Sequence, residues 1–132
     1  MPLALHHLAV VVRDLEAAER FYVGVLDLPV KRRWHDDAGQ PRSVWVELAG
    51  GAFLAIERAG AAGPTRSDVA PGLHCVAFAI DVADRETCRA RLAAAGHPVE
   101  RETAYTLYTR DPDGALVALS HHPTPAISPV EV

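Results

Sequence analysis

The chain has 132 residues, of which 49% are hydrophobic and 23% are charged, a composition typical of one globular domain rather than of a disordered segment. Its formal net charge of −4 at pH 7 provides no basic face for a phosphate backbone, which excludes nucleic acid as an expected partner. No apolar run approaches the roughly 20 residues that a membrane span requires, and the N-terminus lacks the charged start of a signal peptide. We therefore expect a cytoplasmic protein without a membrane partner.

The first half of the chain predicts a strand, a helix and three further strands. Residues 5–12 are rich in β-branched side chains, which favours a strand, and Asp14 is a candidate N-cap for a helix that extends to about Leu26. Apolar residues recur along this helix at intervals of three and four, so one stripe is expected to face a sheet. The three strands are expected near residues 29–34, 42–49 and 52–58, and Gly50 and Gly51 supply the turn between the last two.

The second half predicts the same elements in the same order. A strand is expected at residues 73–80 and a helix from about Asp84 to Ala95, with Gly96 as its left-handed cap. Three strands follow near residues 98–102, 105–110 and 115–120. The tail at 121–132 holds three prolines and cannot continue a central strand, so it forms either an extended strap or a loose end. Cys75 and Cys88 are interpreted as reduced core residues without a disulfide.

The two halves also share a spacing of side chains. His7 precedes Asp14 by seven residues, His74 precedes Asp81 by seven, and both members of the second pair lie 67 residues after the first (74 − 7 and 81 − 14). Such self-similarity indicates an internal repeat. We predict an α+β fold of two βαβββ modules in a single domain that spans residues 1–132. Its parts are module 1 at 3–58, a linker at 59–71, module 2 at 72–120 and a proline-rich tail at 121–132.

Two stretches carry a family resemblance. The run HHLAVVVRDLEAAERFYVGVLDLPV and the run RDPDGALVAL resemble the start and the end of vicinal oxygen chelate proteins, a superfamily that includes glyoxalases, bleomycin-resistance proteins and extradiol dioxygenases. The resemblance covers residues 3 to about 122. It implies that the modules curl into an eight-stranded, cup-like mixed sheet with the helices outside, that the cup takes a small-molecule ligand, and that the protein is a homodimer.

The resemblance also implies a divalent metal: zinc, nickel, iron or manganese. Members of the superfamily hold it with histidines on the first strand of each module and with carboxylates or amides on the fourth, and His7 and His74 match the histidine positions. The carboxylate positions hold Ala55 and Ala118, and a methyl group cannot bind a cation. Glu57 lies two residues beyond Ala55, on the same strand face, and is the candidate substitute for the missing ligand.

Two functions remain open at this point. In the first, His7, His74 and Glu57 form a two-histidine, one-carboxylate site for a glyoxalase-like lyase or isomerase, whose metal stabilises charge on adjacent substrate oxygens. In the second, the chain is a metal-free protein of the bleomycin-resistance type that sequesters a ligand in an apolar cup. A non-catalytic partner domain is a third, weaker alternative. Each of these residues also has an ordinary structural interpretation, as a hydrogen-bonded or solvent-exposed side chain.

Four further side chains are candidates for ligand binding. Trp45 and Tyr105 offer flat walls for a planar ligand, and Tyr108 is expected on a neighbouring strand. Arg110 is positioned just before a turn, where it either holds a ligand carboxylate or pairs with Asp111 or Asp113. Core packing is the alternative role of the two flat side chains.

Overall fold

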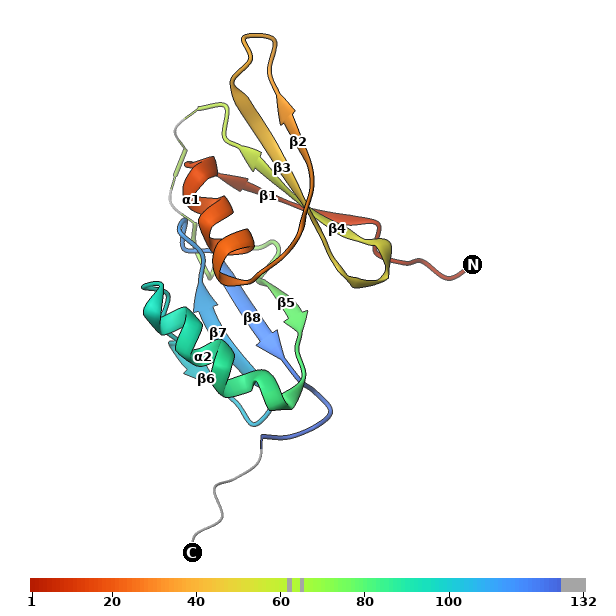
Figure 1. Cartoon of the computed structure of the whole chain (residues 1–132), viewed down its shortest axis with the longest axis vertical. Coiled ribbons are helices and arrows are strands. Elements are labelled where there is room, and N and C mark those ends of the chain that lie inside the picture. The colour runs from red at the N-terminus through yellow and green to blue at the C-terminus, as the bar shows by residue number, and fades with distance from the viewer. Residues whose placement is uncertain (62, 65, 127–132) are drawn as a thin grey trace, which may run out of the picture. The chain divides into compact units, whose positions relative to one another are not determined.

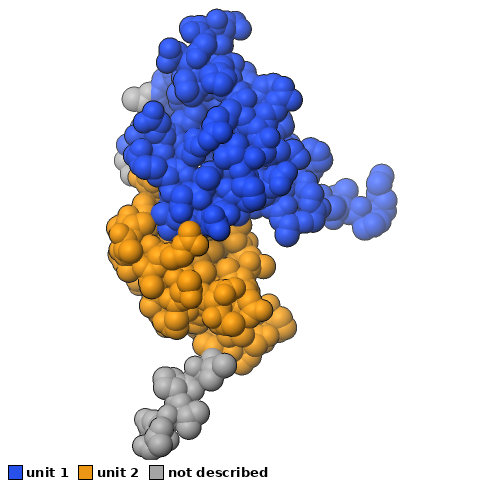
Figure 2. All heavy atoms as spheres, viewed as in Figure 1, with its two compact units in different colours: residues 1–65 blue, residues 66–132 orange. Residues whose placement is uncertain are grey.

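The computed structural model describes residues 1–61, 63–64 and 66–126 (Figure 1). The chain divides into two compact units, residues 1–65 and 66–132 (Figure 2). The boundary between the units falls inside the predicted linker at 59–71. Within the described residues no helix is both long and apolar enough to cross a membrane.

Unit 1 contains the strand, helix and three strands that the sequence predicts. The elements are β1 (His7–Val12), α1 (Leu15–Glu19), a π-helical continuation η1 (Arg20–Val25), β2 (Val30–His35), β3 (Pro41–Glu47), a short turn η2 (Ala49–Gly51) and β4 (Phe53–Arg58). The strands form one mixed sheet in the order β1-β4-β3-β2, in which β1 and β4 run parallel. This order is that of a βαβββ module.

The helix of unit 1 begins where the sequence predicts. The Asp14 side chain accepts a hydrogen bond from the backbone N–H of Ala17 at 3.2 Å, as an N-cap does. The helical path then widens to π geometry, in which the backbone N–H of Leu26 donates to the carbonyl of Phe21 at 3.0 Å. The apolar spacing predicted the extent of the helix but not this widening.

One face of the unit 1 sheet packs against α1, which contacts β3 and β4. Side chains alternate between the two faces of a strand, so every second residue of each strand joins this core. The resulting core comprises Val12, Leu15, Ala18, Phe21, Tyr22, Val44, Val46, Leu54 and Ile56, each no more than 7% exposed. The opposite face carries His7, Ala9 and Val11 of β1.

Unit 2 repeats the architecture with β5 (Cys75–Ala79), a short turn η3 (Val82–Asp84), α2 (Arg85–Ala94), β6 (Arg101–Glu102), β7 (Thr106–Arg110) and β8 (Leu116–Ser120). Its strands form a second mixed sheet in the order β5-β8-β7-β6. Leu92 of α2 and Leu107, Val117 and Leu119 of the sheet are buried in its core. The α+β class and the two βαβββ modules are therefore as the sequence predicts, and each module forms its own four-stranded sheet.

The structure corrects the assignment of Cys75 and describes the start of the tail. Cys75 is exposed at the start of the edge strand β5 and is not a core residue, while Cys88 is half-buried, and both thiols are free. The first residues of the tail act as a strap, because the N–H of His121 donates to the carbonyl of Tyr105 at 2.8 Å and the N–H of Ala126 donates to that of Ala104 at 2.6 Å. The remainder of the predicted tail, residues 127–132, lies outside the described residues.

Candidate functional site

A row of four side chains crosses the unit 1 sheet on the face opposite α1, which we call the candidate face. In the strand register, Ala9 of β1 lies beside Ala55 of β4, Ala55 lies beside Trp45 of β3, and Trp45 lies beside Arg32 of β2. Ala55 is 3% exposed. The position where the superfamily pattern expects an acidic ligand is therefore a buried methyl group with a second methyl group on one side and an indole ring on the other.

Unit 2 carries a matching row. Ala77 of β5 lies beside Ala118 of β8, Ala118 beside Tyr108 of β7, and Tyr108 beside Arg101 of β6. Ala118 is 1% exposed, and the Arg101 guanidinium carbon lies 4.1 Å from the centroid of the Tyr108 ring. Each module thus builds the sequence alanine, alanine, aromatic residue, arginine across its sheet.

The two rows fix which residues of the modules are equivalent. Ala9 corresponds to Ala77, so equivalent residues in the first strands of the two modules are 68 positions apart (77 − 9). The histidine and aspartate pairs in the sequence had suggested a separation of 67. The residue equivalent to His7 is consequently Cys75. His74 corresponds to His6, lies one residue before β5, and is exposed.

The ring of His7 is stacked on a phenylalanine ring. Its ring lies parallel to that of Phe53, with centroids 4.8 Å apart and an interplanar angle of 10°. Its Nδ1 lies 2.8 Å from Nδ1 of His6, at hydrogen-bonding distance. His7 is therefore held on the candidate face of unit 1, at the end of the sheet where Phe53 begins β4.

Glu57 lies too far along the sheet to share an ion with His7. His7 is opposite Phe53, whereas Glu57 is opposite Val11, so four residues, or roughly 13 Å of extended chain, separate the two positions. Ligand atoms of one metal ion each lie about 2 Å from it. His7 and Glu57 consequently cannot meet at a single ion in this register.

The donors present do not fit the metal site of the superfamily pattern. Of its four positions, two hold the donors His7 and Cys75 and two hold Ala55 and Ala118, whose methyl groups have no lone pair. His7 belongs to unit 1, whereas Cys75 and His74 belong to unit 2. Across the described part of the chain, no group of three or more histidine, cysteine, aspartate or glutamate side chains could hold a metal ion.

Aromatic rings form a continuous line across the candidate face of unit 1. Phe53, stacked on His7, is followed by Trp45 at a centroid distance of 4.5 Å and an interplanar angle of 26°, and Trp45 is followed by Trp34 at 5.2 Å and 59°. Arg32 places its guanidinium carbon 3.7 Å from the centroid of the Trp34 ring. The Trp45 predicted to form a flat wall is thus the centre of a larger aromatic surface.

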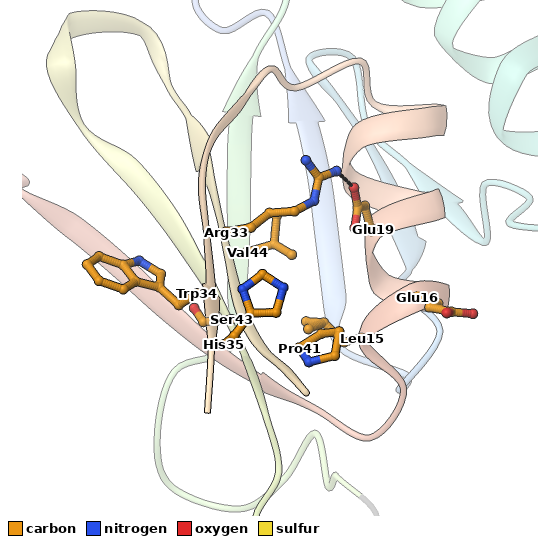
Figure 3. A pocket seen from close by; sticks show the side chains of 9 residues that line it. All are labelled: Leu15, Glu16, Glu19, Arg33, Trp34, His35, Pro41, Ser43 and Val44. Carbon is orange, nitrogen blue, oxygen red and sulfur yellow. Dashed lines mark hydrogen bonds and ion pairs between the residues drawn. The ribbon is translucent and has the colours of Figure 1, made fainter. Parts of the chain in front are cut away.

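A hollow of about 160 Å³ lies between α1 and the β2–β3 pair, and Trp34 and Ser43 are among the residues that line it (Figure 3). Arg33 reaches across it to form an ion pair with Glu19 of α1, and His35 and Leu15 lie nearby. Trp34 extends away from α1 in this view, and Arg33 extends toward it. Adjacent residues of β2 therefore serve opposite faces of the sheet.

The remaining candidates occupy different environments in unit 2. Tyr108 is half-buried in the row described above, next to Ala118. Tyr105 lies just before β7, is 36% exposed, and contacts the His122 ring edge-to-face at 4.9 Å. It belongs to the strap region and not to the row.

Arg110 is engaged by acidic side chains of its own unit. It donates two hydrogen bonds to the Asp68 carboxylate at 2.7 and 2.8 Å and one to Glu100 at 2.9 Å. These hydrogen bonds lower the pKa of Asp68 and raise that of Arg110. Arg110 therefore fixes the segment before β5 to β7 through Asp68 and Glu100.

Sequence reasoning missed the basic side of the aromatic surface. Lys31 and Arg32 both lie over rings: the Lys31 ammonium is 5.7 Å from the centroid of Phe53, and Arg32 covers Trp34. A β-bulge between Val30 and Arg32 shifts the register of β2, which simple alternation does not reveal. The spacing of two between Arg32 and Trp34 is the signal that could have placed them on one face.

Comparisons with known proteins agree with this architecture. The model of the glyoxalase/bleomycin resistance protein/dioxygenase superfamily matches residues 4–119. A glyoxalase family protein from Enterococcus faecalis is 25% identical, with 89% of this chain and 97% of that chain covered and a TM-score of 0.73. A glyoxylase/bleomycin resistance protein/dioxygenase domain from Frankia sp. is 23% identical, with coverage of 92% and 98% and a TM-score of 0.74.

A mutant of the fosfomycin resistance protein FosX from Listeria monocytogenes, in complex with Mn(II) and dihydroxypropylphosphonic acid, shares the fold. It is 20% identical, with 92% of this chain and 93% of that chain covered and a TM-score of 0.72. No curated protein matches the sequence.

Proposed function

Because the chain belongs to the glyoxalase/bleomycin resistance protein/dioxygenase superfamily, we propose that it is a small-molecule-binding protein that works without a metal ion, as the bleomycin-resistance type would. The observation that carries the proposal is the pair of buried alanines, Ala55 and Ala118, at the two equivalent positions where the superfamily pattern expects acidic ligands. The ligand would lie on a sheet face that carries such a row.

The chemistry of the rows supports binding more than catalysis. Methyl groups and aromatic rings favour contact with apolar or planar surfaces, and the arginine at the end of each row adds a cation. His7, the one histidine on the candidate face of unit 1 in β1, is stacked on Phe53. Sites of this composition hold a ligand by burial and by a few polar contacts.

The alternative is a metal-assisted lyase or isomerase. It is favoured by the donors His7 and Cys75 at equivalent positions of the two modules, and by the Mn(II) in the FosX complex of similar fold. That activity requires a third ligand to supplement these two donors. The two functions therefore predict opposite responses to chelation.

The deciding experiment combines metal analysis with thermal unfolding. Protein purified without added metal is expected to contain no stoichiometric transition metal and to gain none when titrated with Mn(II), Zn(II), Ni(II) or Fe(II). After treatment with a chelator, planar compounds from a small-molecule panel are expected to raise its melting temperature, because a ligand selective for the folded state stabilises that state.

Two variants sharpen the result. His7→Ala should leave the metal content at zero and reduce ligand stabilisation only modestly. Glu57→Gln, at another of the three candidate metal ligands, should likewise leave the metal content at zero. One bound metal per chain that disappears in His7→Ala, together with ligand stabilisation only in the presence of metal, would establish the lyase or isomerase alternative and refute the proposal.

We also propose that the protein is a homodimer. The edge strand β1 presents Val11, which is 67% exposed, and the segment before it presents Leu3 and Leu5, which are 93% and 63% exposed. Apolar side chains beside an unpaired strand edge are typical of surfaces that another chain covers. Light scattering during size-exclusion chromatography should give twice the chain mass, and Val11→Lys should shift the protein toward the monomer.

A further inference from the structure

We propose that the ligand is a planar aromatic molecule with a carbonyl group beside an N–H, such as an aromatic lactam, held on the unit 1 sheet by Trp34, Ser43 and Trp45. This inference rests on the proposed function and specifies the ligand of that site. It comes from three buried polar atoms that have no partner, from the rings around them, and from the charges on the same face.

The first argument is the set of unsatisfied polar atoms. Nε1 of Trp34, Nε1 of Trp45 and Oγ of Ser43 are buried and have no hydrogen-bond partner among the residues that the structure describes. Ser43 is 1% exposed. Buried polar groups in folded proteins are nearly always paired, so three unpaired ones together indicate an acceptor that comes from outside the chain.

The second argument is that the three atoms belong to one sheet face. Ser43 lies opposite Trp34 in the β2–β3 register, and Trp45 follows Ser43 by two residues on the same strand. An indole N–H can only donate, whereas a hydroxyl can donate or accept. A carbonyl oxygen, which accepts two hydrogen bonds, suits this set of donors.

The third argument concerns shape. The rings of Phe53 and Trp45 are stacked at 26°, and Trp34 continues the line at 59° to Trp45. Next to them, Ala9 and Ala55 provide a flat stretch of small side chains. A planar molecule matches such a surface, because aromatic rings pack by offset stacking or by edge-to-face contact.

The fourth argument concerns charge. The cations Lys31 and Arg32 lie over rings of this face, and strand alternation brings two carboxylates, Glu47 and Glu57, to the same face. Glu57 lies opposite Ser43 in the register. An anionic ligand group there would face a like charge, so a neutral carbonyl is favoured, and its adjacent N–H can donate to Glu57.

The test uses the two tryptophans of the chain as reporters. The indole region of a ¹H–¹⁵N correlation spectrum therefore contains two signals. Both signals report on the site, because both tryptophans lie on the candidate face. Titration with 2-quinolone, an aromatic lactam, should move both indole protons downfield as they become hydrogen-bonded. 2-Piperidone, the lactam without an aromatic ring, and N-methyl-2-quinolone, without the N–H donor, should each bind at least about fivefold more weakly.

Variants identify the contacts. Ser43→Ala should weaken 2-quinolone binding by roughly five- to tenfold, which corresponds to one hydrogen bond, and Glu57→Leu, which has no acceptor for the lactam N–H, should remove the preference over N-methyl-2-quinolone. Ser67→Ala, in the linker, is the control and should bind as the parent chain does. Ser43→Ala removes only a hydroxyl, so it leaves the aromatic surface and its packing in place.

The outcomes separate this inference from the proposed function. If a planar compound raises the melting temperature of chelator-treated protein but 2-quinolone leaves both indole signals unmoved, the lactam assignment is wrong and the proposed function stands. Indole shifts that require added metal would refute the proposed function. Equal binding of 2-quinolone and 2-piperidone, or an unchanged affinity in Ser43→Ala, would overturn the contacts proposed here.

Discussion

Arg85 is a buried cation that connects α2 to the end of the unit 2 sheet. It is 6% exposed, and its guanidinium lies 2.8 Å from Nε2 of His121 and donates to the carbonyl of Thr103 at 2.8 Å. Removing it leaves Nε2 of the buried His121 and the carbonyl of Thr103 without this donor. We expect Arg85→Met to lower the free energy of unfolding by about 3 kcal/mol, measured by urea titration monitored by circular dichroism.

Arg89, one turn along the same helix, is the matched control. It pairs with Glu86 and Glu102 at the surface, where ion pairs contribute about 0–1 kcal/mol. Arg89→Met should therefore change the free energy of unfolding by less than about 1 kcal/mol. Equal losses in the two variants would contradict a special role for Arg85.

The two equivalent alanines give a second prediction at the residue scale. Ala118→Glu places a carboxylate in a site that is 1% exposed and should lower the free energy of unfolding by about 3 kcal/mol, because burial removes the charged group from water. Ala77→Glu changes the neighbouring residue of the same row at an exposed position. That variant should unfold within about 1 kcal/mol of the parent chain.

The helix ends illustrate the element scale. Gly96 follows α2 with a φ of +82°, which an L side chain adopts only with strain, whereas Gly24 lies in η1 without a positive φ and has open space around it. Gly96→Ala should lower the free energy of unfolding by about 1 kcal/mol. Gly24→Ala should raise it by about 0.5 kcal/mol, because alanine restricts the unfolded chain. Thermal unfolding of both variants checks the opposite signs.

The contact between Asp68 and β7 makes stability depend on pH. Hydrogen bonds from Arg110 hold the pKa of Asp68 below its ordinary value of 3.8, so the unfolded chain takes up the proton first as the pH falls. The contribution is complete at pH values well above 3.8 and is lost as the pH falls from there through the lower folded pKa. Asp68→Asn should therefore flatten the decline of the free energy of unfolding between about pH 5 and pH 2.

The secondary structure could be predicted from the sequence, whereas the pairing of residues across the sheets could not. The strands and helices follow from β-branched runs, apolar spacing and caps such as Asp14, since these signals are local. The equivalence of His7 and Cys75 could not be read in the same way. It depends on which residues pair across the sheet, and the adjacent His6 and His7 allow two alignments that differ by one position.

Site chemistry was predicted less completely than the fold for a related reason. Trp45 and Tyr108 were expected as ligand-binding side chains, and the structure places them at equivalent positions of the two rows. The positions of Lys31 and Arg32 over aromatic rings depend on a bulge in β2. The ion pair of Arg110 is formed with Asp68, which is 42 residues away in the chain. Long-range pairings of this kind leave no local pattern.

At the scale of the whole molecule, the two modules carry the same row with different aromatic residues. Trp45 occupies the position that Tyr108 occupies in the other module, and both tryptophans of the chain lie before residue 65. Tryptophan fluorescence therefore reports only on the N-terminal half, whereas far-ultraviolet circular dichroism reports on the secondary structure of both halves. Denaturation curves recorded with the two signals would coincide if the chain unfolds in a single cooperative transition. They would have different midpoints if the two halves unfold one after the other.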